Sequence, residues 1–311
     1  MTRPPLRWAL GGLYGLGAAA GIAWALRGAQ WSAVGAFAEP RAVPYVGAAV
    51  ACNVVGIVLG MVAWRTLLTA MSGPVPARAA RRIYFVSFLG KYIPGRVWTL
   101  FAQLRLAGEA GVGPGAMAAT FGLSLAVVTL TGLVAGAVIA PSLGVGAAWL
   151  AVPVAVFVLG LARPRWVIAP LVWACRLAGR PLHVPPDADR PLRAAFGVQL
   201  ACWAVSGLHL WLLAVVLGAD PLPALPAAVG GFALAMVVSS YAVVVPDGAG
   251  VREVLLALAL GTVLPLSAVG VAVVASRLLC LVTEVGTASA AAFRGIVRTR
   301  IEVSHVDAHV R

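Results

Sequence analysis

Residues 227–260 read AAVGGFALAMVVSSYAVVVPDGAGVREVLLALAL, an apolar stretch with a polar break in its middle. The break contains Pro246, Gly248 and Gly250, and Asp247 lies between the first two. Proline removes a helical hydrogen bond, and glycine costs about 1 kcal/mol in a helix interior relative to alanine. This second broken segment is therefore predicted to form two helical arms joined by a non-helical turn.

The composition of the whole chain excludes a soluble globular protein. Of 311 residues, 61% are hydrophobic and 11% are charged, and the mean hydropathy is +0.97, whereas soluble domains carry roughly 25% charged residues. The net charge of +13 fits arginine-rich loops facing an anionic membrane leaflet better than it fits nucleic-acid binding. The four cysteines are isolated in apolar segments, so neither a disulfide framework nor a metal site is expected.

A first broken segment, residues 83–115, has the same form. Its apolar arms are interrupted at Pro94 and Gly95, and Arg96 follows the break as Arg252 follows the later one. Irregular backbone occurs at membrane depth only where protein or a water-filled cavity surrounds it. Both broken segments are therefore predicted to be re-entrant helical hairpins, the first entered from the cytoplasmic side and the second from outside.

Apolar stretches long enough to be membrane spans lie at 8–26, 44–68, 116–140, 147–161, 194–217 and 267–293. An amphipathic segment at 166–177, flanked by arginines, is predicted to lie at the interface. Most basic residues then fall on one side, which the positive-inside rule makes cytoplasmic, together with both termini. The preference for arginine over lysine suggests a GC-rich bacterial genome, hence the bacterial cytoplasmic membrane.

The predicted fold class is an all-α polytopic membrane protein with about six full spans and two re-entrant hairpins. The chain 1–311 is a single integral-membrane domain in this interpretation. Residues 1–143 and 144–293 contain the same elements in the same order with opposite orientation, which predicts an inverted repeat, and 294–311 form a cytoplasmic basic tail. In the alternative, both arms of the second broken segment cross the membrane and the chain has eight spans.

The first group of candidate site residues comprises Lys91, Arg96, Gln103, Arg105 and Glu109. Charges inside a membrane cost several kcal/mol unless they pair or face water. Helix ends at a Pro-Gly break also expose backbone N–H groups that favour anions. A phosphate or phosphodiester head group would suit these residues, while the alternative is a basic surface loop that holds inner-leaflet lipids.

A second group, Asp247, Arg252 and Glu253, surrounds the later break. Its structural interpretation is that Asp247 caps the following helix, Glu253 complements the helix dipole, and a local ion pair forms. Its functional interpretation rests on three charges lying within an apolar segment, where capping alone does not require them.

The third group lies on polar stripes of two predicted spans, 194–217 and 267–293. Arg277 and Glu284 share one face of the 267–293 span, either as a functional pair or as a structural ion pair to the hairpins. His209 lies on a polar stripe of the 194–217 span, where it is either a hydrogen-bonded packing residue or a proton relay.

Enzyme signatures are missing from the sequence: it contains no HExxH, no GxSxG, no phosphate-binding P-loop and no paired histidines. We therefore expect no enzymatic activity, no cofactor and no metal.

The two breaks also carry a family resemblance. Pro94-Gly95-Arg96 with the following LRLxG at 104–108, and VPDGAGVRE at 245–253, resemble the membrane domain of lysylphosphatidylglycerol synthases and the wider group of flippase-like membrane proteins. The resemblance covers nearly the whole chain. It implies lipid translocation, and the aminoacyl-transferring domain of the synthases has no counterpart here, so lysyl-lipid synthesis is not expected.

The leading hypothesis is a lipid flippase that moves an anionic phospholipid or a polyprenyl-phosphate-linked sugar between leaflets. Lys91, Gln103 and the arginines Arg96, Arg105, Arg252 and Arg277 would bind the substrate. The carboxylates Glu109, Asp247, Glu253 and Glu284, with His209, would balance charge or couple protons. Two alternatives stay open: a non-catalytic membrane partner of an envelope glycosyltransferase or lipid synthase, and an integral-membrane transferase acting on a lipid phosphate.

Overall fold

The computed structural model describes residues 31–92, 97–140, 148–177, 184–242 and 246–309, together with the single positions 144, 146 and 179. The predicted span at 8–26 and the hairpin residues Pro94, Gly95 and Arg96 lie outside these described residues.

Every regular element of the described residues is helical, which confirms the predicted all-α class. The long helices are α2 (Val43–Ser72), α5 (Pro114–Ala137), α8 (Asp189–Val216), α9 (Pro221–Ser240) and α11 (Leu266–His309). The shorter helices are η1 (Trp31–Ala38), η2 (Pro40–Ala42), α3 (Ala77–Phe88), η3 (Leu89–Tyr92), α4 (Val97–Glu109), α6 (Ala148–Ala162), α7 (Pro164–Leu177), η5 (Pro246–Gly248) and α10 (Val251–Leu260).

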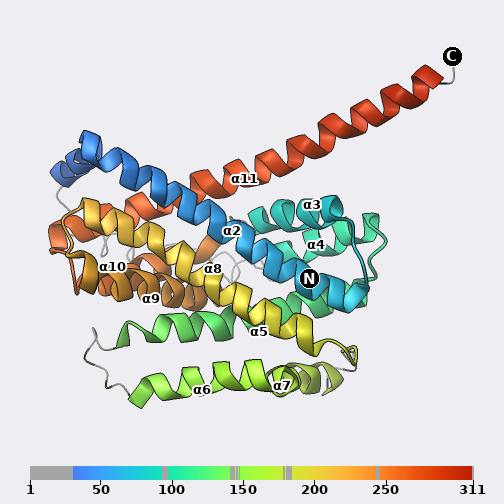
Figure 1. Cartoon of the computed structure of the whole chain (residues 1–311), viewed down its shortest axis with the longest axis horizontal. Helices are drawn as coiled ribbons and strands as arrows, with labels where there is room; N and C mark the ends of the chain where they lie inside the picture. Colours follow the sequence, from blue (N-terminus) through green and yellow to red (C-terminus); the bar gives the residue numbers. More distant parts are fainter. Residues whose placement is uncertain are drawn as a thin grey trace, which may run out of the picture.

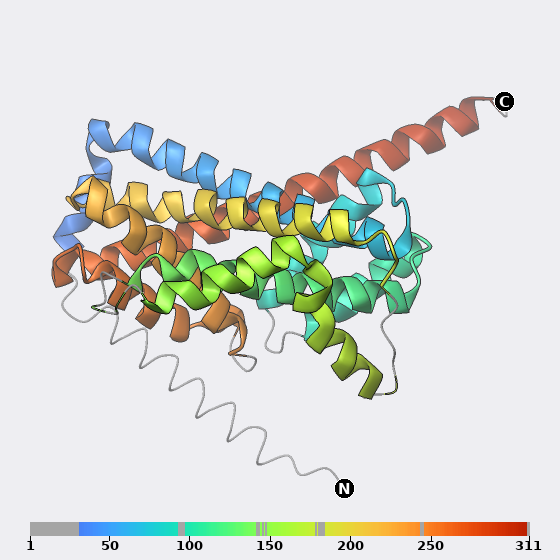
Figure 2. The same cartoon turned by 60° about the horizontal axis from the view of Figure 1, so that its bottom comes forward.

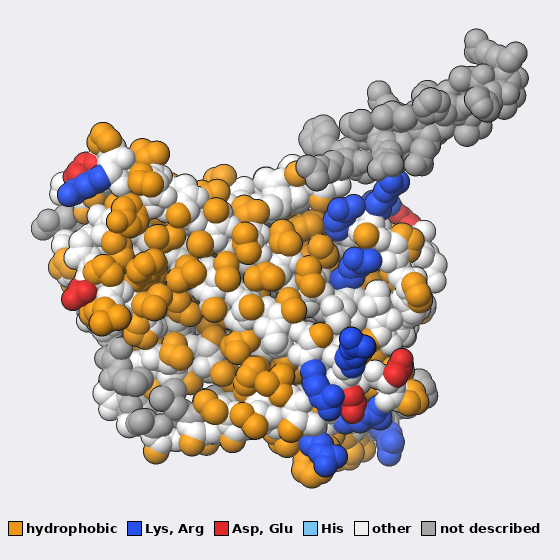
Figure 3. All heavy atoms as spheres, viewed as in Figure 1, with side chains coloured by type: hydrophobic (Ala, Val, Ile, Leu, Met, Phe, Trp, Pro, Cys, Tyr) orange, Lys and Arg blue, Asp and Glu red, His pale blue; other side chains and the backbone are white. Residues whose placement is uncertain are grey.

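Within the described residues, five helices are long and apolar enough to cross a membrane, and the bent α6–α7 pair raises the number to at most six. The pair is bent by 118°, and α7 turns away from the bundle in Figure 2. Space-filling shows hydrophobic side chains over the middle of the molecule and most of the Lys and Arg side chains of this face at one end (Figure 3). The chain is thus a multi-pass membrane protein with an apolar belt and a basic end.

Helix α9 differs from its prediction because it begins at Pro221 rather than at residue 227. The Asp220 carboxylate accepts a hydrogen bond from the Leu222 N–H at 3.3 Å, and Pro221 fits the first helical position. With 20 residues, α9 is itself long enough to cross. Helix α10 has 10 residues, about 15 Å, which is half of a ~30 Å hydrocarbon core. The number of crossings in this segment stays a prediction.

Helices α2 and α8 form the most extensive helix pair and run side by side in Figure 1. Their close approach depends on Gly56, where an added Cβ would lie 2.0 Å from Ser206 Oγ. The GxxxG spacing of Gly56 and Gly60 is therefore used for packing within this chain. A second buried core joins α8, α9, α10 and α11 around Phe232 and Leu256.

The two broken segments reach the centre of the bundle from opposite ends (Figure 1). Helices α3 and α4 pack against each other as a pair, and α9 packs against α10. The short helices η3 and η5 contact each other, so the two broken segments meet in the interior. The order long helix, broken pair, long helix occurs twice, as α2 to α5 and as α8 to α11. That the two halves form an inverted repeat stays a prediction.

Candidate functional site

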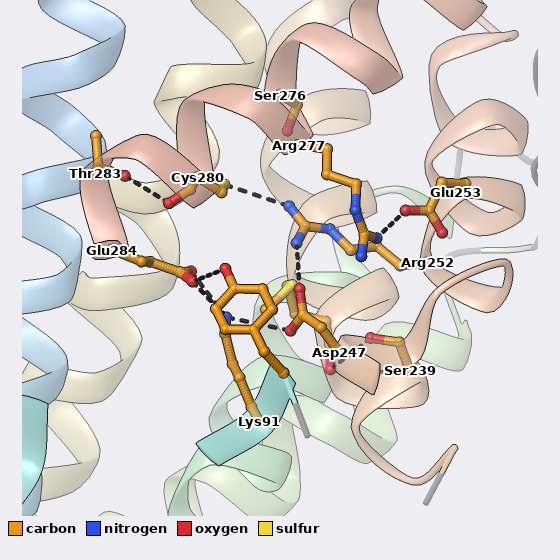
Figure 4. Close-up of polar contacts among 12 residues, drawn as sticks. Lys91, Ser239, Asp247, Arg252, Glu253, Ser276, Arg277, Cys280, Thr283 and Glu284 are labelled. Carbon is orange, nitrogen blue, oxygen red and sulfur yellow. Dashed lines mark hydrogen bonds and ion pairs between the residues drawn. The ribbon is translucent and has the colours of Figure 1, made fainter. Parts of the chain in front are cut away.

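Lys91, at the turn of the first broken segment, lies between two carboxylates (Figure 4). Its Nζ is 3.2 Å from Asp247 Oδ1 and 2.8 Å from both oxygens of Glu284. The hydroxyl of Tyr92 donates a second hydrogen bond to Glu284. Lys91 therefore ties η3 both to the second broken segment and to α11.

Arg252 is the largest fully buried side chain among the described residues. Its Nη1 is 3.5 Å from Asp247 Oδ2, and its Nη2 donates to Cys280 Sγ at 3.3 Å. The guanidinium carbon also lies 5.6 Å from the ring centre of Phe232, within cation–π range. Asp247 thus links Lys91 and Arg252 in one continuous chain of ion pairs.

Arg277 of α11 pairs with Glu253 of α10. Glu253 also accepts a hydrogen bond from the Gly250 N–H at 2.6 Å, which satisfies a backbone donor at the start of α10. Glu253, not Asp247, therefore stabilises this helix end, and Asp247 is used for the ion pairs. Arg277 and Glu284, predicted to share one face of their helix, therefore have different partners: Arg277 pairs with Glu253, and Glu284 pairs with Lys91.

The break that presents Asp247 depends on unusual backbone angles. Asp247 has φ +49°, and Gly248 and Gly250 have φ of +64° and +86°. A Cβ on Gly248 would lie 2.4 Å from Ser239 Cβ, so both the angle and the space require glycine there. The sequence PDGAG thereby turns the chain sharply against the end of α9.

These contacts define a charge network of three cations and three carboxylates: Lys91, Arg252, Arg277, Asp247, Glu253 and Glu284. All three carboxylate side chains are at most 8% exposed, and each lies within 4 Å of a cation. Burying an unpaired charge costs several kcal/mol, so the pairing is what makes this network tolerable inside an apolar bundle. Taken together, the six charges cancel.

A cavity of about 270 Å³ adjoins the charge network. Lys91, Asp247 and Glu284 contribute to its wall. Most of the remaining wall comes from α2, α3, α4, α5, α8 and α9, and it is largely apolar. Aromatic side chains that line it are Trp64, Tyr84, Phe88, Phe121, Trp203 and Phe232. An apolar cavity with a few polar groups is the usual form of a small-molecule site.

Two other predicted residues lie close to this centre. Gln103 of α4 is 5% exposed and lines the cavity. His209 is fully buried; its Nε2 is 2.8 Å from Ser276 Oγ, and its ring stands edge-on to Phe232. These contacts match the interpretation of His209 as a hydrogen-bonded packing residue.

The structure does not bring Arg105 and Glu109 to the site. The Arg105 side chain is 85% exposed, and Glu109 forms ion pairs with Arg82 at 3.0 Å and with Arg105 at 3.9 Å. Gln103 and Arg105 are two positions apart, so they point to different sides of α4. The predicted grouping of these residues therefore separates into an inward Gln103 and an outward ion pair at the basic end.

Several residues of the site and of the cavity wall were missed in the sequence. Tyr92 follows Lys91 directly, and its position beside a buried charge was the available signal. Trp64, Tyr84 and Phe88 gave no signal, because aromatic residues in apolar helices more often pack in cores. Among the described residues, no group of three or more His, Cys, Asp or Glu side chains is arranged to hold a metal ion.

Comparison with known proteins identifies the family of this chain. A search of curated proteins gives no match. A family model described as "Lysylphosphatidylglycerol synthase TM region" matches residues 8–285, which include both broken segments and the whole charge network. The chain therefore belongs to the family of lysylphosphatidylglycerol synthase transmembrane regions.

Proposed function

We propose that this protein is a lipid flippase of the bacterial cytoplasmic membrane, which moves an anionic phospholipid or a polyprenyl-phosphate-linked sugar between leaflets. The single observation that carries the proposal is the cavity of about 270 Å³ at the meeting point of the two broken segments. A transporter with paired interrupted helices binds its substrate at such a point, near the membrane midplane. Membership in a lipid-linked family supports the same function.

The charge network gives this site a means of changing shape. Lys91 is shared between Asp247 and Glu284, which lie on different elements, and it can keep one partner while it leaves the other. Movement of η3 away from Asp247 would then not strand an unpaired buried charge, because Lys91 keeps Glu284 and Asp247 keeps Arg252. Stranding such a charge would cost about 3–5 kcal/mol. In the proposed mechanism the two re-entrant pairs part and close around the head group, and the lipid tails stay in the bilayer.

Reconstitution tests this function directly. The purified chain is placed in liposomes containing phosphatidylglycerol labelled on an acyl chain, and a membrane-impermeant reductant bleaches the label in the outer leaflet. Wild-type protein should carry inner-leaflet label outward, so that bleaching proceeds beyond the half reached in protein-free liposomes. Lys91→Gln and Asp247→Asn should slow this phase at least tenfold, because the first leaves Glu284 without a cation and the second leaves Arg252 without a carboxylate.

The matched control is Arg105→Gln, which changes a cation of the same broken segment that is 85% exposed. It should transport like the wild type. Equal bleaching with and without protein, for both labelled phosphatidylglycerol and a labelled polyprenyl-phosphate sugar, would exclude the proposal. If a glycosyltransferase co-purifies and transport occurs only in its presence, the alternative of a membrane partner protein replaces it.

A further inference from the structure

The cavity wall contains polar atoms that no group among the described residues satisfies. Trp64 Nε1, Gln103 Oε1, Ser124 Oγ and Ser240 Oγ are buried without a hydrogen-bond partner, and all four side chains line the cavity. Trp64, Gln103 and Ser240 are 4%, 5% and 8% exposed. An unsatisfied buried polar group costs about 1–3 kcal/mol, so four in one wall point to a ligand that supplies the missing partners.

The chemistry of these atoms restricts that ligand. The indole N–H of Trp64 can only donate, the amide oxygen of Gln103 can only accept, and the two serine hydroxyls can do both. A phosphate oxygen without a proton cannot satisfy Gln103, and an ammonium cannot satisfy Trp64. A hydroxyl donates and accepts, so a group bearing several hydroxyls can satisfy all four atoms.

The charges beside the cavity also favour an uncharged ligand. Asp247 and Glu284 line the wall, and the cations near them are already paired, so an added phosphate would leave uncompensated negative charge. An added ammonium would meet Lys91, whose Nζ already lies 4.6 Å from the ring centre of Phe88. Lys91 therefore already lies over Phe88, and its positive charge repels a second cation in the same cavity.

The aromatic wall offers a surface for the non-polar face of such a group. Trp64 and Tyr84 have ring centres 5.5 Å apart, and Tyr84 stacks on Phe88 at 5.7 Å. The C–H face of a sugar or glycerol unit can pack on the electron-rich ring faces. The cavity of about 270 Å³ is close to the lower end of the roughly 300–1,000 Å³ range of small-molecule pockets, which is enough for one sugar ring or glycerol unit.

From these observations we infer that the cavity binds the uncharged, polyhydroxylated part of a lipid head group, a sugar ring or a glycerol unit, and that the phosphate of that lipid stays outside it. This inference rests on the proposed function and names the part of the substrate that the buried site recognises. Trp64, Gln103, Ser124 and Ser240 make its hydrogen bonds, and the charge network closes one side.

Binding of short-chain probes tests the inference. The full chain in phosphatidylcholine nanodiscs, free of sugar-based detergent, is titrated with octyl glucoside, dihexanoylphosphatidylglycerol, octyl phosphate and octylammonium, each corrected for partition into empty nanodiscs. At least one of the first two should bind at least tenfold more tightly than octyl phosphate and octylammonium. Preference for octyl glucoside identifies a sugar, and preference for the phosphatidylglycerol probe identifies glycerol.

Variants locate the binding. Gln103→Leu and Ser240→Ala should each weaken the preferred probe about five- to tenfold, since each removes one hydrogen-bonding group. Arg105→Gln should leave it unchanged. An unchanged melting temperature in nanodiscs would show that the variants fold. The comparison of probes on the wild type tests the inference without any variant.

The inference and the proposed function fail separately. The inference is wrong if octyl phosphate or octylammonium binds as tightly as the polyol probes. It is also wrong if Gln103→Leu and Ser240→Ala leave polyol binding unchanged. Either result holds even if liposomes show transport. If polyol binding is selective and weakened by the variants but no lipid is transported, the inferred binding site is supported and the proposed flippase function is excluded.

Discussion

At the scale of single residues, Lys91 is the side chain on which the interior depends most. It is the only lysine in the chain, its side chain is 14% exposed, and it faces two carboxylates that are 8% and 6% exposed. Asp247 retains Arg252 when Lys91 is removed, whereas Glu284 retains only the hydrogen bond from Tyr92 among the contacts described above. The energetic loss should therefore fall mainly on Glu284.

A double-mutant cycle measures this dependence. Lys91→Met alone should lower the free energy of unfolding by about 3–5 kcal/mol, because it strands a buried carboxylate. Lys91→Met with Glu284→Gln should recover part of the loss, which gives a coupling of at least about 1 kcal/mol. Unfolding in mixed micelles with increasing dodecyl sulfate, followed by circular dichroism, provides the free energies.

Arg105 and Glu109 provide the matched surface pair. They are 3.9 Å apart with side chains 85% and 43% exposed, so Arg105→Met and Glu109→Gln should couple by no more than about 0.5 kcal/mol. If the Lys91 and Glu284 substitutions prove additive, the buried ion pair does not exist in the folded protein.

The charged members of the site could be predicted from the sequence, but their partners could not. Lys91, Arg252 and Glu284 stand out because charges are rare in apolar segments, and that rarity is a matter of solvation energy. Which carboxylate meets which cation depends on how separate helices pack, and Lys91 and Glu284 are 193 positions apart. Arg105 has the same residue type as Arg252, but its side chain lies on the exposed side of α4.

At the scale of elements, the two breaks were the strongest signal in the sequence. Proline and glycine interrupt helices through backbone sterics, which act locally and are readable without the fold. The start of α9 was misplaced because prolines at 221, 223 and 226 resemble a loop, whereas the first of them fits the opening turn behind Asp220.

Gly248→Ala tests the geometry of the second break. Holding alanine at φ +64° costs about 1–2 kcal/mol, and the contact of its Cβ at 2.4 Å with Ser239 Cβ adds about 1–3 kcal/mol of overpacking. The variant should unfold at a lower temperature and should slow lipid transport, because Asp247 is displaced from Lys91. Thermal unfolding and the liposome assay measure the two effects.

Gly197→Ala is the control for this substitution. Gly197 lies within α8 with no atom within 4 Å of an added Cβ and no positive φ, so alanine should stabilise the helix by up to about 1 kcal/mol. A Gly248→Ala variant as stable and active as Gly197→Ala would mean that the chain does not turn at Gly248 in this way.

At the scale of the whole molecule, the face shown in Figure 3 has hydrophobic side chains over its middle and most of its Lys and Arg side chains at one end of the long axis. The sequence predicted this segregation, since the apolar stretches and the arginines between them can be located without knowing the tertiary structure. The number of crossings was harder to predict, because α6 with 15 residues is apolar enough for a span but only about 22 Å long. Its angle to α7 is a tertiary property.

The orientation of the molecule gives the last prediction. The exposed arginines Arg78, Arg81 and Arg82 lie at the start of α3, and α9 begins at the opposite end of the bundle (Figure 1). The positive-inside rule then places Ala77 in the cytoplasm and Leu222, which is 81% exposed, outside. In intact cells a membrane-impermeant maleimide should label Leu222→Cys at once and Ala77→Cys only after permeabilisation.

Neither substitution removes a charge, so neither changes the arginine pattern that sets the orientation. The unsubstituted chain gives the background of its four native cysteines, which are buried or half-buried. Labelling of Ala77→Cys before permeabilisation, with Leu222→Cys protected, would reverse the molecule in the membrane. In that case the first broken segment would open to the outside, and the proposed route of the lipid would run from the opposite leaflet through the same cavity.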